Sequence, residues 1–252
     1  QVDVGIVTGA NNYFLVSKEI VNTYNLRNYS YPMFGRSSHC PGIIYDEKQH
    51  ASNSENNLPS NFIYFDIDST EKLDAFQKEY IELGLSQNIH KRYKCRIRKP
   101  WFKVPSVYST KLALLKRCHN FPRLILNSFL AYTTDTAYRI KLLDNTITDL
   151  DFTYTFINSL TALSAELEGR HYGGGVLELV PTEIEKLLIP KYTQVTKNAL
   201  EDLDLKIRES NYENIFALQN NTILKSIGLN SNEISILYSA WLKLKNRRQR
   251  KN

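Results

Sequence analysis

The last quarter of the chain differs in composition from everything before it, and this contrast limits the possible folds. Residues 194–252 contain no proline and one glycine, whereas the preceding residues hold all eight prolines and nine of the ten glycines. Apolar residues recur in this region at helical spacing. The 252-residue chain is therefore expected to be α+β, with a β-rich body over residues 1–190 and a helical C-terminal extension over residues 191–252.

Strands are expected where short apolar and β-branched runs occur in the body. Residues 2–8 and 13–16 would form a hairpin around Gly9 and the following asparagines. Further strands are expected at residues 62–68, 123–129, 138–143 and 176–180. Residues 22–60 are rich in Asn, Ser, Tyr and Pro, and their sequence HASNSENNLPSN predicts a polar, mobile loop.

Helices are expected where apolar spacing coincides with capping residues. The first would begin at Asp68, with Glu71 as the capping-box partner, and end at Gly84. Asn230 and Glu233 would cap the last helix in the same way. The other expected helices span residues 150–167, 195–209 and 212–226, and the last one spans residues 231–247.

Positive charge is concentrated in one segment. The net charge is +6. This value alone points only weakly to a nucleic-acid partner, since many basic proteins bind none. Between Glu82 and Asp135, however, 52 consecutive residues contain eleven Lys or Arg and no Asp or Glu. Ion pairs within such a segment cannot cancel its positive field. The distribution therefore favours a polyanion as the partner.

The densest part of this segment contains YKCRIRKPWFK. Seven cations lie within thirteen residues: Lys91, Arg92, Lys94, Arg96, Arg98, Lys99 and Lys103. In an extended strand, alternate cations would form a row about 7 Å apart while Tyr93, Cys95 and Ile97 point to the opposite, buried face. Such a row could contact phosphates or guanine edges. Alternatively, the cations could belong to a solvated edge strand, where charged side chains prevent aggregation. Fewer than seven charges would be enough for that purpose.

A second candidate site precedes a run of three glycines. Arg170, His171 and Tyr172 supply a cation, a hydrogen-bonding ring and a stacking ring. The glycines at 173–175 either cradle a phosphate or form a sharp loop.

Two other features also have two interpretations. Trp101 and Phe102 either stack on bases or anchor the core. The cations of the C-terminal KLKNRRQRKN are explained by a solvated helix end as readily as by DNA contact.

Several classes of function lack any support in the sequence. No dinucleotide-binding, Walker A or nucleophile-elbow motif is present. The three cysteines and five histidines follow no metal-ligand spacing, so we expect reduced thiols in a cytoplasmic protein and no metal. No apolar run is long enough to cross a membrane. The first residue is not Met and no signal peptide follows, so we expect a piece of a longer protein.

Four stretches, in this order, resemble a known family. They are GIVTGANNYF (5–14), YKCRIRKPWFKVP (93–105), PRLILNSFLAYTTDTAYRI (122–140) and INSLTALSAELEGRHYGGGVLELVPTEIEKLLIP (157–190). Together they are similar to the C-terminal target-recognition part of adenine-specific DNA methyltransferases of the TaqI type, from bacterial restriction–modification systems. The resemblance covers nearly the whole chain apart from the region after Asn22.

The resemblance implies a two-part parent enzyme. Its N-terminal catalytic domain would bind S-adenosylmethionine through an F-x-G-x-G loop and methylate the N6 amino group of adenine with an N-P-P-Y type loop. Neither motif occurs in this chain. The expected function is therefore recognition of double-stranded DNA, with no catalytic residue and no cofactor in this chain. The seven cations of residues 91–103 and residues 170–172 are the expected DNA contacts.

Two other functions fit the same sequence. The chain could be a separate specificity subunit that docks a methylase or nuclease through its helical extension. It could also bind RNA through the same cationic segment. Sequence upstream of Gln1 would distinguish the specificity subunit, and competition between duplex DNA and RNA would distinguish the RNA-binding module.

Overall fold

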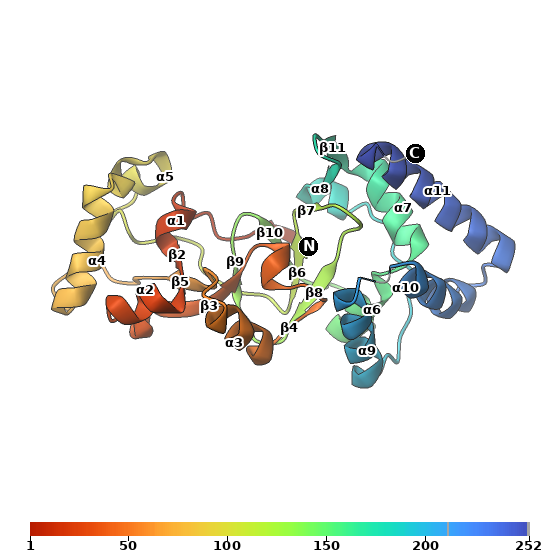
Figure 1. Cartoon of the computed structure of the whole chain (residues 1–252), viewed down its shortest axis with the longest axis horizontal. Helices are drawn as coiled ribbons and strands as arrows, with labels where there is room; N and C mark the ends of the chain where they lie inside the picture. The colour runs from red at the N-terminus through yellow and green to blue at the C-terminus, as the bar shows by residue number, and fades with distance from the viewer. Residues whose placement is uncertain (211, 251–252) are drawn as a thin grey trace.

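A computed structural model describes residues 1–210 and 212–250 of the protein. The chain forms an elongated molecule, in which a central sheet separates an N-terminal lobe from a helical C-terminal lobe (Figure 1). Short strands in three sheets are combined with helices of up to 19 residues. This architecture confirms the expected α+β fold class.

The central sheet has five strands in the order β1-β10-β6-β8-β4. They are β1 (Val2–Val4), β4 (Ile44–Tyr45), β6 (Leu112–Leu115), β8 (Leu124–Asn127) and β10 (Ala137–Ile140). β6 lies in the middle, antiparallel to both β10 and β8, while β4 joins β8 in parallel. Every residue of β6 and β10 is buried, since the sheet is covered on both faces.

The N-terminal lobe surrounds a four-stranded sheet of order β2-β5-β3-β9. Its strands are β2 (Leu15–Val16), β3 (Ser30–Phe34), β5 (Asn61–Ile63) and β9 (Tyr132–Thr133). Its helices are α1 (Asn11–Phe14), α2 (Lys18–Thr23), η1 (Arg27–Tyr29), η2 (Ser37–His39), α3 (Glu47–Glu55), α4 (Ala75–Ser86), η3 (Ile89–Lys91) and α5 (Tyr93–Arg96). Buried aromatic rings, among them Phe62 and Tyr80, form its core.

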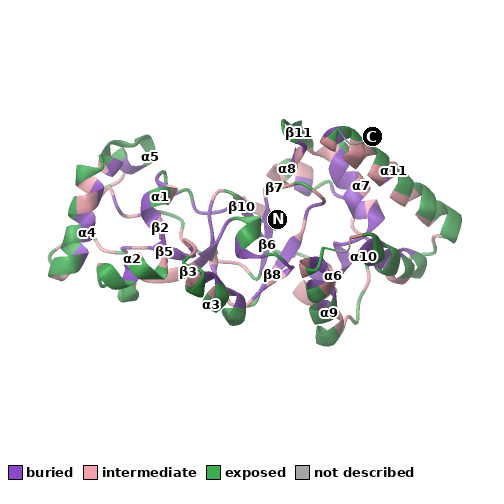
Figure 2. Cartoon of the chain, in the orientation of Figure 1, coloured by how far each residue is buried: buried purple, intermediate pink, exposed green. Residues whose placement is uncertain are grey.

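The C-terminal lobe joins a small sheet to the helical region. The sheet has the order β11-β12-β7 and contains β7 (Arg117–Cys118), β11 (Arg170–Tyr172) and β12 (Val176–Glu178). The helices are α6 (Asp149–Thr155), α7 (Ser159–Glu168), α8 (Pro181–Ile184), α9 (Lys197–Arg208), α10 (Tyr212–Gln219), the π-helical turn η4 (Asn220–Leu224) and α11 (Ser231–Gln249). Figure 2 shows buried residues along α7 and exposed residues on the outer side of α11.

The expected N-terminal hairpin does not form. β1 pairs with β10 in the central sheet, whereas β2 pairs with β5 in the N-terminal lobe. α1 and the segment before it separate the two strands. The hairpin prediction was therefore wrong. β10 and β5 are buried strands, and pairing with them gives β1 and β2 buried neighbours that a local hairpin would not provide.

The expected loop HASNSENNLPSN (50–61) is wrong over its first half, because α3 (Glu47–Glu55) covers residues 50–55. α3 is polar along its length, and its side chains hydrogen-bond to one another and to the backbone. Gln49 Nε2 donates to Asn53 Oδ1 at 3.0 Å, and Asn53 Nδ2 donates to the His39 carbonyl at 2.9 Å. A helix stabilised in this way has no apolar periodicity for sequence reasoning to detect.

Two helix predictions need correction. The N-cap of α4 is Asp74, six residues later than the expected Asp68, and Gln77 completes its capping box. Asp68 instead forms an ion pair with Lys103. The helix expected at residues 150–167 is two helices, because the buried Asn158 side chain accepts a hydrogen bond from Thr161 N at 2.9 Å and starts α7 anew.

The helical C-terminal region forms as expected. α9, α10 with η4, and α11 correspond to the three predicted helices, and Asn230 and Glu233 form the predicted capping box of α11. One buried cluster combines strand residues such as Leu114 and Leu177 with Phe216 and Trp241 of the helices. The division into domains at residue 190 stays a prediction. Among the described residues, no helix combines the length and apolarity that crossing a bilayer requires.

Candidate nucleic-acid interface

The basic segment is not the strand that its alternating pattern predicted. It forms η3 and the short helix α5, followed by a cis peptide bond between Lys99 and Pro100. Cys95 is fully buried, with its Sγ 3.8 Å from the carbonyl oxygen of Thr8, whereas Tyr93 and Ile97 are exposed. The helical turn therefore separates Cys95 from the two residues with which it was expected to share a buried face.

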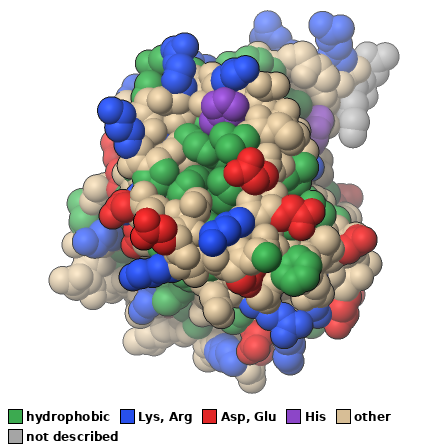
Figure 3. Space-filling model, turned by 90° about the vertical axis from the view of Figure 1, so that its left-hand side faces the viewer, with side chains coloured by type: hydrophobic (Ala, Val, Ile, Leu, Met, Phe, Trp, Pro, Cys, Tyr) green, Lys and Arg blue, Asp and Glu red, His purple; other side chains and the backbone are tan. Residues whose placement is uncertain are grey.

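Most cations of this segment are exposed and unpaired. Figure 3 views the end of the molecule that α4 and α5 form, and shows Lys and Arg side chains along its upper edge, with Asp and Glu among further Lys and Arg lower down. Five of these cations make no ion pair with any described residue: Lys91, Arg92, Lys94, Arg96 and Lys99. Their field is consequently free to act on a ligand.

The other two expected DNA contacts bind within the protein. Arg98 donates to the carbonyl oxygens of Thr8 and Val7, and burial lowers the pKa of its guanidinium. Lys103 Nζ lies 2.9 Å from Asp68 and 3.3 Å from Asp66, and hydrogen bonds to these carboxylates raise its pKa. In this arrangement both side chains hold the N-terminal lobe together.

Trp101 and Phe102 belong to the core of this lobe. Phe102 is buried and meets the ring of Phe65 edge-on at a centroid distance of 5.8 Å. Trp101 is half-buried, 5.4 Å from the ring of Tyr13. Of the two roles considered for this pair, the structure favours the core anchor.

The second expected site lies on β11, the exposed strand of the β11–β12 hairpin. Arg170 Nε donates to Glu183 at 2.8 Å, and His171 Nε2 lies 3.6 Å from the buried Glu166. Tyr172 is 47% exposed, and the Arg117 guanidinium lies 5.7 Å from its ring centroid. Gly173 and Gly174 have no neighbour near an added Cβ, so the glycine run forms the open turn of this hairpin.

α5 and the β11–β12 hairpin occupy corresponding positions on the molecule. Both lie along the upper edge in Figure 1, on opposite sides of the central sheet. The two groups of residues expected to bind DNA are thus not adjacent, but they face the same side.

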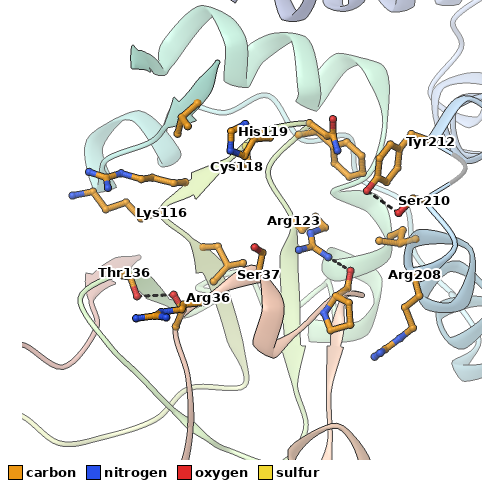
Figure 4. Close-up of a pocket in the computed structure, with 18 of the residues that line it drawn as sticks. Arg36, Ser37, Lys116, Cys118, His119, Arg123, Thr136, Arg208, Ser210 and Tyr212 are labelled. Carbon is orange, nitrogen blue, oxygen red and sulfur yellow. Dashed lines mark hydrogen bonds between the residues drawn. The ribbon is translucent and has the colours of Figure 1, made fainter. Parts of the chain in front are cut away.

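A cation-lined pocket lies between the central sheet and the C-terminal helices (Figure 4). Its volume is about 760 Å³. Five cations line it, from four separate parts of the sequence: Arg36, Lys116, Arg117, Arg123 and Arg208. Lys116, Arg117 and Arg123 belong to the acid-free segment, whereas nothing in the sequence connected Arg36 and Arg208 to them.

Internal contacts already engage most cations of this pocket. Lys116 and Arg117 bind Glu178, and Arg123 donates to the carbonyl of Gly42 at 2.8 Å. Burial would raise the pKa of Glu178, but hydrogen bonds from the two cations outweigh it and the pKa is lowered. Arg208 binds Asp204 at 2.6 Å. Arg36 forms no ion pair with a described residue, so the pocket retains less free charge than α5.

The C-terminal cations are partly internal as well. Arg248 is buried and binds Glu166, whereas Arg247 is exposed on α11. Lys251 lies outside the described residues. Within residues 1–210 and 212–250, His, Cys, Asp and Glu side chains form no group of three that could hold a metal ion.

Comparison with known proteins identifies the family of the chain. The family model described as type II methyltransferase M.Eco57I, C-terminal domain, matches residues 1–224. The chain belongs to this family. The expected resemblance to DNA methyltransferases is thereby confirmed at the level of a type II methyltransferase C-terminal domain. No curated protein sequence matches the chain.

The fold of this methyltransferase C-terminal domain is also found in a solved structure. The type IIG restriction endonuclease BpuSI is similar over 100% of this chain, with a TM-score of 0.59 and 13% sequence identity. At this identity the similarity concerns the fold alone. The chain spans 30% of the length of the BpuSI chain.

Proposed function

We propose that this chain recognises double-stranded DNA in a sequence-specific manner, as the target-recognition part of a TaqI-type, N6-adenine DNA methyltransferase. The observation that carries the proposal is the group of five exposed, unpaired cations from Lys91 to Lys99. Phosphate groups of a duplex are the polyanion that such a surface fits, because each neutralised phosphate releases condensed counterions.

The proposal includes a longer parent enzyme. A catalytic domain in the same longer chain would bind S-adenosylmethionine and transfer its methyl group to adenine, in the cytoplasm. The solved relative supports a longer chain, since it is a single chain of which this fold covers 30%. Detection of N6-methyladenine in DNA incubated with the full-length protein and S-adenosylmethionine tests this part. N4-methylcytosine in its place would contradict it.

Salt dependence of binding tests the electrostatic part of the proposal. Four or five phosphate contacts should give a slope of about −4 when log K is plotted against log salt concentration. The triple variant Lys94→Ala, Arg96→Ala, Lys99→Ala should reduce the slope by about 3. Lys48→Ala is the control, since this exposed lysine belongs to α3, which lies along the lower edge in Figure 1, whereas α5 lies along the upper edge.

Two results would contradict the proposal. A flat salt response of the unmodified protein would exclude a phosphate-binding surface. Tighter binding to single-stranded RNA than to duplex DNA of the same sequence would favour the RNA-binding alternative. If the protein is encoded without an upstream catalytic domain, it would instead act as a separate specificity subunit.

A further inference from the structure

α5 and the residue that follows it, Ile97, expose two large apolar side chains on one face. Tyr93 is 64% exposed and Ile97 is 60% exposed. Residues four apart lie on the same side of a helical turn, and Cys95, two residues from each, points in the opposite direction into the core. The packing of α5 on the N-terminal lobe thus uses Cys95 and leaves Tyr93 and Ile97 uncovered.

Cations flank this apolar face on both sides. At 100° per residue, Lys94 and Arg96 project to opposite sides of the line that joins Tyr93 and Ile97. Lys94 Nζ lies 5.6 Å and Arg96 Cζ 5.8 Å from the Tyr93 ring centroid. Lys91, Arg92 and Lys99 extend the positive charge beyond both ends of the turn. The surface is therefore a narrow apolar strip with positive borders.

A nucleic-acid groove has the complementary pattern. Two phosphate backbones border each groove of a duplex, and base edges lie between them. Base faces become accessible where a base step is unstacked. Cations on both borders would meet phosphates and leave the central apolar strip against the bases.

We propose that Tyr93 and Ile97 contact nucleobases, with Tyr93 stacking on a base face and Ile97 packing beside it. This inference rests on the proposed function, since it takes duplex DNA as the ligand. It adds contacts with bases to the contacts with phosphates that the cations of this segment are proposed to make. Exposed aromatic and aliphatic side chains in DNA-binding proteins insert between base steps or stack on unpaired bases.

Binding affinity is the first test, measured with a duplex that the unmodified protein selects from a randomised pool. Tyr93→Ala should weaken binding about 5- to 100-fold, the range found for stacking rings. Tyr93→Phe should retain the affinity, because stacking requires the ring and not the hydroxyl. The salt slope should be the same in both variants, since neither changes the charge. Ile97→Ala should weaken binding, whereas the control Ile236→Ala, an equally exposed isoleucine on α11 at 59%, should not.

Photo-crosslinking supplies a direct test of contact. Duplexes carrying 5-iodouracil at single positions are irradiated with the protein, and the attached peptide is identified by mass spectrometry. Attachment to Tyr93 at one or two adjacent positions is expected. Attachment to Tyr172 alone, with full affinity retained by Tyr93→Ala, would overturn the inference.

The outcomes separate this inference from the proposed function. If the unmodified protein selects no duplex, the proposed function fails first. If it selects a duplex with a steep salt slope, but Tyr93→Ala and Ile97→Ala bind it normally, only the stacking role is wrong. Thermal unfolding of each variant confirms that any loss of affinity does not come from loss of the fold. Weaker binding of Tyr93→Ala to single-stranded RNA alone would also overturn the inference.

Discussion

Arg98 Nη1 donates a hydrogen bond of 2.8 Å to the carbonyl oxygen of Thr8. The second guanidinium nitrogen, Nη2, donates to the neighbouring carbonyl of Val7 at 2.7 Å. These bonds attach the end of the basic segment to the chain just before α1. The exposed face of α5 owes its position to this attachment and to the buried Cys95.

Replacing Arg98 should therefore affect stability before it affects recognition. Arg98→Ala should lower the free energy of unfolding by about 1–3 kcal/mol, because two charge-assisted hydrogen bonds to backbone carbonyls are lost. Urea unfolding followed by circular dichroism measures this, with the exposed Arg96→Ala as a control that stays within about 0.5 kcal/mol. If the stability is unchanged and the slope of log K against log salt concentration for DNA binding falls by about 1, Arg98 contacts a DNA phosphate instead.

Gly9 should be required for the position of α5. Its φ of +78° is one that residues with a Cβ rarely adopt, and an added Cβ would lie 2.5 Å from the Cβ of Lys94. Gly9→Ala should destabilise the protein by about 1–3 kcal/mol and also weaken DNA binding, since α5 must move. Gly173→Ala is the matched control, having no atom within 4 Å of the added Cβ. Equal stability of the two variants would contradict the prediction.

The buried ion pair between Arg248 and Glu166 should anchor α11. Arg248 Nη2 lies 2.7 Å from Glu166 Oε1, both side chains are fully buried, and Arg248 also donates to the carbonyl of Gly175. Arg248→Ala would remove both guanidinium contacts of the buried Glu166 carboxylate and leave it only His171 Nε2, 3.6 Å away, so it should cost about 3–5 kcal/mol of stability.

Thermal or urea unfolding tests this anchor, with Arg247→Ala as the exposed neighbour that should change little. The double variant Arg248→Met, Glu166→Leu should recover most of the stability, because it removes both charges. If the double variant is no more stable than Arg248→Ala, the loss comes from packing and not from the unpaired charge.

Stability should fall in mild acid because of His39. This residue is buried, its Nδ1 has no hydrogen-bond partner, and burial lowers its pKa to about 4, from 6.5. The unfolded chain then binds the proton more tightly, so stability is fully present above pH 6.5 and decreases as the pH falls towards 4. The difference amounts to about 3 kcal/mol at most. Urea unfolding between pH 7 and 4 measures it, and His39→Leu should show a correspondingly flatter profile. If stability depends on pH equally in the unmodified protein and in His39→Leu, His39 is not the group responsible.

Sequence reasoning succeeded where the information was local. The capping box of Asn230 and Glu233, and the helices of the C-terminal region, depend on residues three or four apart, and the structure contains them. The acid-free segment is likewise a property of the chain itself. Its positive charge cannot be cancelled within the segment, because the segment contains no acidic residue. Acidic residues from elsewhere in the chain nevertheless pair with Lys103, Lys116 and Arg117.

Only the tertiary structure decided how that charge is presented. The alternation of YKCRIRKPWFK fits a strand, but contacts with Thr8 and Gly9, some 85 residues earlier in the chain, hold it as a helical turn. Those contacts engage Arg98 and expose Tyr93. Likewise, Arg36 and Arg208 meet Arg123 only because β8, η2 and α9 pack together. Pairing between distant segments depends on the burial that the whole fold provides, and no local pattern contains it. The sequence thus determined that the surface is cationic, and the fold determined which cations remain free.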